Sequence, residues 1–365
     1  MSGRSGKKTI FKYIQSETPP GTPGELWLDT NWNVVRQWIP LNDDDPVNTG
    51  VWRTYGSYFG IGSDYGYICG GNDGTNDLST IERISFPFDS GSTTLLGNLT
   101  ISRARLSSCN SSLYGYVCGG GDSGSEFSTI DRFSFPFDSG TATNVGNLSV
   151  AFARGSGFNS SLYGYANAGF ISGSDRSFLD RITFPFDSGT ATNLGGMGTR
   201  SNRANLNSSS HGYACGGELT SIARDDIYSI QFANDGGGAA VAGLLSINRQ
   251  DIPNCGNNSS TYGYVWGGGS NGLSSIDRLT FPFDSGSATL IGNMSTSRRH
   301  SSTNNSSTHG YVYGGSPSDN EQSSIERIEF PFDSGISNII ANLNATVSLL
   351  AAVDGTDFVS QFPAL

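Results

Sequence analysis

Short runs of alternating apolar and polar residues, separated by Gly, Asn, Asp and Ser, follow one another from about residue 50 to the C-terminal region. Such runs are typical of β-strands joined by tight turns, and helix is expected to be nearly absent. In a representative stretch, strands are predicted at residues 103–109, 113–118, 129–137 and 142–148. The pattern predicts an all-β fold made of sets of four antiparallel strands.

A regular repeat underlies the pattern. The motif FPFDSG and one divergent copy, FANDGG, begin at Phe86, Phe135, Phe184, Phe232, Phe281 and Phe330. These starts are 49, 49, 48, 49 and 49 residues apart. A fixed period of this length is typical of repeat architectures, and four short strands per repeat predict the blades of a β-propeller.

The number of blades depends on the chain ends. Six full repeats span residues 50–345, and residues 346–365 read as half a blade. Residues 25–40 form a hairpin pattern that could supply the missing two strands, which would remove an open sheet edge. The sequence therefore predicts a propeller of residues 25–365 with seven blades, the last shared by both chain ends. The alternative is six blades plus a separate N-terminal hairpin.

Composition narrows the function. Charged residues make up 15% of the chain, the net charge is −11, and there are 50 Gly. An acidic chain without a Lys/Arg stripe is not expected to bind nucleic acid, and without a long apolar run it is not expected to insert into a membrane. Lacking a signal-like N-terminus, it is expected to be made in a cytoplasm. Cys69, Cys118 and Cys215 share one repeat position, which favours buried, reduced thiols.

Residues suited to catalysis are few. Two of the three His, His211 and His309, stand where other repeats have Tyr, and the third is His300. No nucleophile elbow, zinc spacing or phosphate-binding loop is present, so the sequence predicts no enzyme, no metal and no cofactor. The Asn-x-Ser/Thr triplets recur at the same turns, which indicates turn chemistry.

Paired charges recur in the third strand of the repeats, as Glu82–Arg83 and Asp131–Arg132 illustrate. Neighbouring residues in a strand point to opposite faces. We therefore expect the Arg of one blade to meet the carboxylate of the next, in a ring interrupted at Tyr228 and Ser229.

The loops between the second and third strands differ in every repeat, whereas the NSS and DSG turns on the opposite face are nearly uniform. Divergent loops on a rigid scaffold are where recognition is usually built. The candidate binding residues are Asn72, Asp73, Asn76, Asp77, Asp122, Glu126, Asp175, Arg176, Glu218, Arg224, Asp225, Asn271, Asp319, Asn320 and Glu321.

Residues 1–24 differ from the repeats, being basic at first and rich in Pro and Gly at the end. They are interpreted as an extended attachment arm and linker. The candidate anchoring residues are Arg4, Lys7, Lys8, Phe11, Lys12 and Tyr13.

The repeat resembles the kelch repeat of β-propellers. The resemblance rests on Arg105, Arg154 and Arg203 of the first strand, on YGYVCGG, IDRFSFPFD and TNVGNL, and on the period of about fifty residues. The late Trp of kelch blades is replaced by residues such as Val145 and Leu194. This departure argues against a close link to eukaryotic kelch adaptors or galactose-oxidase-like enzymes.

A narrower resemblance is to repeats of tailed bacteriophages, especially marine cyanophages. PPGTPGELWLDTNWNVVRQW is likewise similar to PGDLWxDT-type hairpins of phage tail and fibre proteins. These resemblances imply a non-enzymatic virion protein in a symmetric multi-copy assembly. Its arm would bind other virion subunits, and its propeller rim would bind a host-surface glycan or protein. The alternatives are a tail, neck or capsid component without host contact and, less favoured, a carbohydrate-active enzyme with Arg, Glu and Tyr clustered at the axis.

Overall fold

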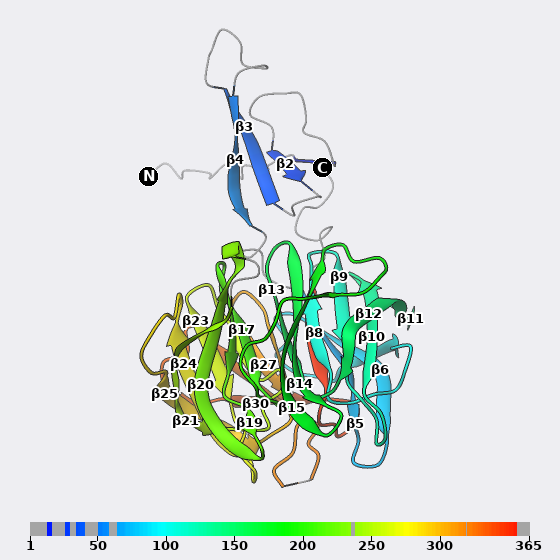
Figure 1. Ribbon diagram of the computed structural model, residues 1–365, viewed down its shortest axis with the longest axis vertical. Coiled ribbons are helices and arrows are strands. Elements are labelled where there is room, and N and C mark those ends of the chain that lie inside the picture. Colours follow the sequence, from blue (N-terminus) through cyan, green and yellow to red (C-terminus); the bar gives the residue numbers. More distant parts are fainter. Residues whose placement is uncertain are drawn as a thin grey trace, which may run out of the picture. The chain divides into compact units, whose positions relative to one another are not determined.

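A computed structural model describes the backbone of four N-terminal strands and residues 64–234, 238–318 and 320–355. The chain divides into two compact units, Met1–Ile61 and Gly62–Leu365. In the first unit, β1 (Tyr13–Ser16) pairs in parallel with β2 (Leu26–Asp29), and β2, β3 (Val34–Pro40) and β4 (Gly50–Ser57) form an antiparallel meander (Figure 1). The predicted hairpin forms, but in a sheet of its own.

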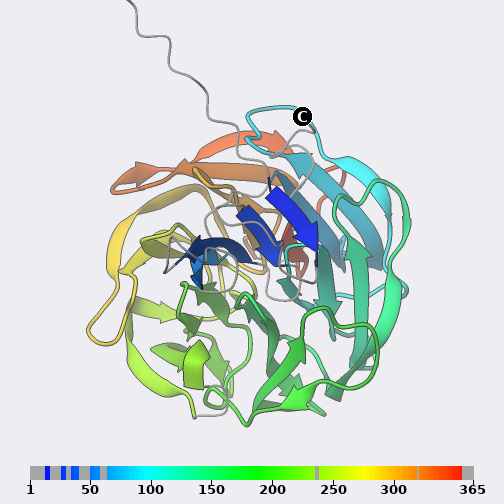
Figure 2. The same ribbon diagram turned by 90° about the horizontal axis from the view of Figure 1, so that it is seen from above.

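The second unit is a β-propeller with six blades in the described part of the chain. In Figure 2 the blades follow one another around a centre in chain order. From the axis outward, blade 1 consists of β31 (Ala351–Gly355), β5 (Tyr65–Asn72), β6 (Asp77–Ser85) and β7 (Thr94–Asn98). Blade 2 consists of β8 (Ser107–Asn110), β9 (Tyr114–Cys118), β10 (Phe127–Ser134) and β12 (Thr143–Phe152). Blade 3 consists of β13 (Ser156–Asn159), β14 (Tyr163–Ile171), β15 (Ser174–Thr183) and β16 (Thr192–Asn193).

Blades 4 to 6 repeat the arrangement. Blade 4 consists of β17 (Ala204–Asn207), β18 (His211–Cys215), β20 (Ile222–Gln231) and β21 (Ala240–Arg249). Blade 5 consists of β22 (Gly256–Asn258), β23 (Tyr262–Trp266), β24 (Leu273–Thr280) and β25 (Thr289–Arg298). Blade 6 consists of β26 (Ser302–Asn305), β27 (His309–Tyr313), β28 (Ser324–Glu329) and β30 (Asn338–Asn342). Three short strands, β11 (Gly140–Thr141), β19 (Glu218–Leu219) and β29 (Gly335–Ile336), and the 3₁₀ turn η2 (Phe232–Asn234) complete this unit.

The prediction of seven blades is wrong, and the alternative of six is confirmed. Residues 351–355 are not half of a further blade, because β31 pairs with β5 as the innermost strand of blade 1. Gly355 and Asp64 occupy the places of Ser111 and Leu113 in the turn of blade 2, and Asp64 N–H donates to the Gly355 carbonyl at 2.9 Å. The C-terminal strand therefore closes the ring without the N-terminal hairpin.

The FPFDSG motif lies at the joints between blades. The third strand ends before it, at Ser134 in blade 2 and not at Phe137 as predicted. At all six joints, the first Phe of the motif stacks on a Tyr of the preceding blade. Ring centroids are 4.8–5.7 Å apart in the pairs Phe86–Tyr311, Phe135–Tyr67, Phe184–Tyr116, Phe232–Tyr165, Phe281–Tyr213 and Phe330–Tyr264. Packed aromatic pairs of this kind bury large apolar area and so hold the blades together.

Polar contacts reinforce the same joints. Phe137 N–H donates to the Tyr67 hydroxyl at 2.9 Å, and four other joints repeat this bond. Beyond the motif, β11 pairs in parallel with β7, the outermost strand of the preceding blade. A Cβ at Gly97 would lie 1.9 Å from the Gly140 carbonyl oxygen, so this close approach requires glycine.

The expected ion pairs between blades form, but with different partners. Arg83 binds Asp138, the Asp of the next FPFDSG copy, at 2.7 Å, and Arg132, Arg278 and Arg327 bind the equivalent Asp. The acidic neighbours of these arginines point the other way. Asp131, Asp277 and Glu326 form fully buried ion pairs with Arg103, Arg249 and Arg298.

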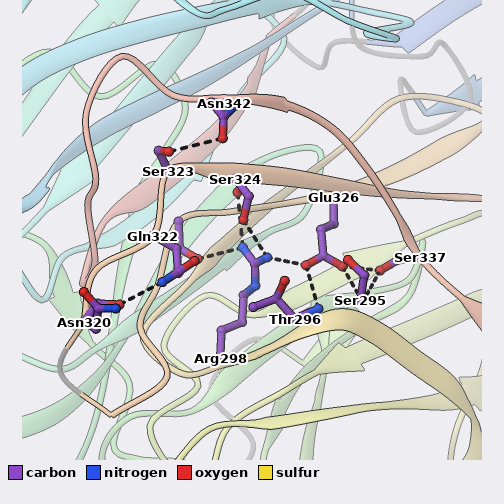
Figure 3. Close-up of polar contacts among 11 residues, drawn as sticks. Ser295, Thr296, Arg298, Asn320, Gln322, Ser323, Ser324, Glu326, Ser337 and Asn342 are labelled. Atoms are coloured by element: carbon purple, nitrogen blue, oxygen red, sulfur yellow. Dashed lines mark hydrogen bonds and ion pairs between the residues drawn. The ribbon is translucent and has the colours of Figure 1, made fainter.

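Figure 3 shows one of these buried pairs. Arg298 donates to the Ser324 hydroxyl at 2.9 Å and to Glu326. It also donates to the Gly314 carbonyl at 2.8 Å. Glu326 also accepts from Ser295 N–H at 2.8 Å and from the Ser337 hydroxyl. A buried charge is costly unless it is paired and hydrogen-bonded, as both charges are here. The pair fixes the chain two residues before His300.

A ring of Asn side chains surrounds the axis at the face of the NSS and DSG turns, which we call the turn face. Five of the first strands end at one of its members, and in β31 the member is the last residue but one; the members are Asn110, Asn159, Asn207, Asn258, Asn305 and Asp354. At four of the six positions the side-chain oxygen accepts a backbone N–H from the preceding blade, as Asn305 does from Asn258 at 3.1 Å. The Ser that follows accepts N–H groups of its own turn, as Ser111 does from Tyr114 at 3.0 Å. Turn chemistry therefore accounts for the Ser of NSS and the ring for its Asn.

Candidate functional site

A second ring surrounds the axis at the opposite face, which carries the divergent loops and which we call the loop face. It consists of backbone hydrogen bonds of 2.8–3.1 Å that connect each link between blades to the next. Its members are Arg105, Arg154, Asn202, Asp251, His300 and Leu349, with the N–H of Ile252 acting for Asp251. All six have φ between 52° and 60°. Because the backbone makes the ring, its side chains are left available for other contacts.

The axis is crossed just below this ring by Asn254. Its side-chain Nδ2 donates to the Leu106 carbonyl of blade 2 at 2.8 Å, and its Oδ1 accepts from Gly157 N–H of blade 3 at 3.3 Å. Since Asn254 belongs to the link into blade 5, these bonds extend across the axis. Beneath the loop-face ring, the axis is therefore closed by the Asn254 side chain and its hydrogen bonds.

One half of the polar cluster at this ring is centred on Glu218. Although Glu218 starts the loop of blade 4, it folds inward, where it pairs with Arg154 at 3.4 Å and accepts from Asn202 at 2.8 Å. The Arg154 guanidinium also lies over the Phe170 ring, 4.5 Å from its centroid. These contacts hold Arg154 in place on the loop face.

The other half is centred on Asp251. It accepts from Asn202 at 3.1 Å and forms ion pairs with Arg299 at 3.2 Å and with His300 at 3.1 Å. Because the Asn202 amide binds both Glu218 and Asp251, it connects the two halves. We call Arg105, Arg154, Asn202, Glu218, Asp251, Arg299 and His300 the axial cluster.

The two carboxylates of the axial cluster differ in their electrostatic environment. Burial raises the pKa of Glu218, and the negative charge of Asp251 raises it further. Burial alone would also raise the pKa of Asp251, but the hydrogen bond and charge of His300, with Arg299, hold it below its usual range. Opposite shifts of two neighbouring acids are typical of sites that bind or transfer protons.

Arg105 is the cation of the axial cluster that lacks a partner. Among the described residues, its half-buried side chain forms no hydrogen bond or ion pair. Burial lowers its pKa, and the positive charge of neighbouring Arg154 lowers it further. In addition, Asn202 is 2% exposed and its Oδ1 has no hydrogen-bond partner in the described structure. One cation and one buried acceptor are thus left for a bound group.

Most residues predicted to bind lie apart from this cluster, around the rim. Asn72, Asp73 and Asp122 accept N–H groups of their own loops, so their side chains shape the turns. Others connect neighbouring loops: Asp175 accepts from Thr220 N–H at 2.8 Å, and Glu321 packs against Gly74.

The remaining predicted positions are dispersed. Asn76, Arg176, Asn271 and Asn320 are exposed, and Asp77, Glu126, Arg224 and Asp225 are partly buried. Asp319 and the anchoring residues Arg4, Lys7, Lys8, Phe11 and Lys12 lie outside the described residues, whereas Tyr13 begins β1. Of the predicted site residues that the structure describes, only Glu218 lies in the cluster at the axis.

In blade 4, the residue in the loop-face ring is not the one that the sequence repeat suggests. Arg203 was aligned with Arg105 and Arg154, each 19 residues after the first Phe of an FPFDSG copy. In blade 4 the ring residue is Asn202, 18 residues after Phe184, and Arg203 instead donates to the Met197 and Gly198 carbonyls. The sequence did contain a sign of this ring. The position 19 residues after the first Phe of each motif copy holds Arg, Arg, Asp, His and Leu in the other blades, so its residue type varies from blade to blade.

Two further observations concern the described residues only. They contain no group of three or more His, Cys, Asp or Glu side chains placed to hold a metal ion. They also contain no helix long and apolar enough to cross a membrane. All five Cys are buried and free.

Comparisons with known proteins support the fold. No protein-family model and no curated protein matches the sequence. Among solved structures, the chain is similar to the structure of YjhT, a kelch-repeat protein, with a TM-score of 0.58 and 12% identity. The match covers 75% of this chain and 96% of YjhT. At this identity the likeness shows the fold alone, which is a kelch-like β-propeller.

Proposed function

We propose that this chain is a recognition module of a tailed-phage particle, in which the N-terminal unit binds other virion subunits and the loop face of the propeller binds a host-surface glycan or protein. The observation that carries the binding role is the contrast between the faces. The turn face repeats the same side chains, whereas the loop face combines six different loops with the unpaired Arg105. The chain enters the propeller at Asp64, on the turn face.

Labelling one face at a time tests this role. Ser123 on the loop face and Ser139 on the turn face are both exposed, and the native Cys are all buried. A maleimide-linked polymer would therefore attach only at Ser123→Cys or Ser139→Cys. We expect the polymer at residue 123 to abolish binding of the full-length chain to cyanobacterial cells, and the polymer at residue 139 to leave it intact.

Two outcomes would contradict the role. If the unlabelled chain does not bind cells, the alternative of a purely structural tail, neck or capsid component is favoured. If both labels block binding equally, recognition does not belong to the loop face. The phage assignment itself rests on the sequence resemblance and is tested by recruitment to particles.

Deletion of residues 1–12 is the sharper test of attachment. It removes Arg4, Lys7, Lys8, Phe11 and Lys12 but leaves β1 and its pairing with β2. We expect the shortened chain to fold, as judged by circular dichroism, and to be missing from purified particles. Normal incorporation would show that these residues are not the anchor.

A second candidate function is a carbohydrate-active enzyme, favoured by one observation. The sequence did not lead us to expect Arg and acidic residues together at the axis, yet Arg154, Glu218 and Asp251 lie there with opposite pKa shifts on the two acids. Release of reducing sugar from cyanobacterial polysaccharide, lost in Glu218→Gln, would support it. No release by the unaltered chain would remove it.

A further inference from the structure

We propose that the axial cluster binds an anionic sugar, whose acidic group lies between Arg105 and Arg154 and whose hydroxyl groups bind Asn202 and Glu218. This inference rests on the proposed binding role of the loop face and names its ligand class.

The charges of the axial cluster favour an anion at one position. Arg154 is paired with Glu218, and Asp251 is paired with Arg299 and His300, so these charges are largely compensated. Among the described residues, Arg105 has no partner of this kind, and the negative charge of Asp77 acts on it without forming an ion pair. Because Arg154 lies close enough to disfavour the charge on Arg105, an anion bridging the two would relieve their repulsion.

The backbone holds these two arginines side by side. Arg154 N–H donates to the Arg105 carbonyl at 3.0 Å, and both residues have φ near 60°. The Phe170 ring beneath the Arg154 guanidinium further restricts it. The Arg154 guanidinium is thus fixed beside the unpaired Arg105, and guanidinium groups suit the planar geometry of a carboxylate or the oxygens of a sulfate.

The uncharged part of the ligand follows from the remaining groups. Asn202 Oδ1 is an unused buried acceptor, and the Glu218 carboxylate can accept further hydrogen bonds. Acceptors beside a cation suit a ligand that carries hydroxyl donors next to its acidic group. A simple inorganic anion would leave these acceptors unused, whereas a uronic acid would engage both.

Titration calorimetry with the full-length chain tests the inference, with glucuronate, glucose and inorganic sulfate as probes. We expect glucuronate to bind at least about tenfold more tightly than either glucose or sulfate, which corresponds to about 1.4 kcal/mol. Equal affinity for glucose would overturn the anionic part of the proposal. Equal affinity for sulfate would overturn the sugar part.

Variants locate the site. Arg105→Ala should weaken glucuronate binding at least about tenfold, and Arg105→Lys should weaken it less. The matched control is Arg176→Ala, because Arg176 is an exposed Arg on the same face but away from the axis. Glu218→Gln should strengthen glucuronate binding, because it removes a negative charge and keeps hydrogen-bonding atoms; weaker binding would contradict the proposed geometry.

Failure of this inference can be told apart from failure of the proposed function. If Arg105→Ala binds cells as well as the unaltered chain does, while the polymer at residue 123 still blocks binding, the axial site is wrong and the loop-face role stands. Unchanged unfolding of Arg105→Ala in denaturant would show that a loss of binding is not a loss of folding.

Discussion

The two rings around the axis connect the blades in different ways, one through side chains and the other through the backbone. At the turn face the side chain makes the bond, as when Asn305 accepts from Asn258 N–H, so the ring requires Asn or a close substitute. At the loop face the backbone makes the bond, as between Arg154 and Arg105. Six different blades can therefore present nearly identical side chains at one end and varied ones at the other. The turn face is therefore constrained in its side chains, whereas the side chains of the ring at the loop face are free to vary.

The largest expected effect comes from the buried pair that holds the loop-face ring in position. Glu326→Ala leaves Arg298 buried without its carboxylate partner, and such a change typically costs about 3–5 kcal/mol. The midpoint of guanidinium unfolding should fall accordingly. Glu126→Ala, on a loop, should shift the unfolding free energy by less than about 0.5 kcal/mol. Equal midpoints for the two variants would show that the pair does not hold the ring.

The turn-face ring should be sensitive to its side chains. Asn305→Ala leaves Asn258 N–H without its acceptor and removes a bond to Asp354, so unfolding should become easier by about 1–3 kcal/mol. The same unfolding measurement on the loop-face variant Arg105→Ala is the comparison. If both variants lose the same stability, the two rings do not differ as we infer.

Asp354, the one acid in the turn-face ring, should make stability depend on pH. Burial raises its pKa to about 7, although bonds from Asn305 N–H and Asn304 counteract this. The folded state therefore holds a proton that the unfolded state releases near pH 4, and its stability falls as pH rises from about 4 to about 7. Asp354→Asn should show a smaller difference than the unaltered chain between its unfolding midpoints at pH 5 and pH 8, and the raised pKa of Glu218 accounts for part of what remains. An unchanged pH dependence in this variant would assign it to another group.

The smallest effect on stability is expected at Arg105. Its side chain makes no hydrogen bond or ion pair within the described structure, so Arg105→Ala should change the free energy of unfolding by less than about 0.5 kcal/mol. Thermal unfolding followed by circular dichroism would measure this. A large loss would mean that Arg105 stabilises the ring, in which case its role in binding would need a separate test.

The sequence was a good guide where one residue type recurs for one physical reason. The period of FPFDSG predicted the blades, and the aromatic residues at Phe135 and Tyr67 meet at a joint as a packed core requires. The count of blades was wrong because strand pattern alone does not say which edge a terminal strand will pair with. β31 completes blade 1 by pairing with β5, whereas the N-terminal hairpin finds partners in β1 and β4.

The candidate site was harder to predict because its residues have no motif. Glu218 was chosen for its place in a variable loop, and nothing in the sequence shows that this loop folds inward to Arg154. Asn202 was missed because the chain is one residue shorter between Phe184 and the ring, which shifted the alignment onto Arg203. The differences among the repeats indicated which face of the propeller carries the candidate site. Which residues come together there follows only from the positive φ values and the closed ring of backbone hydrogen bonds.

The position at which the propeller is closed determines which chain connectivities are compatible with the fold. Asp64 and Gly355 meet where every other blade has a turn, and the joint between blades 6 and 1 uses the same contacts as the others, including Tyr311 with Phe86 and Arg327 with Asp89. In topological terms the propeller is a cyclic chain of six equivalent modules opened at one turn. Circular permutation at any of the five remaining turns would preserve every joint, so the order of the modules along the gene is not dictated by the fold.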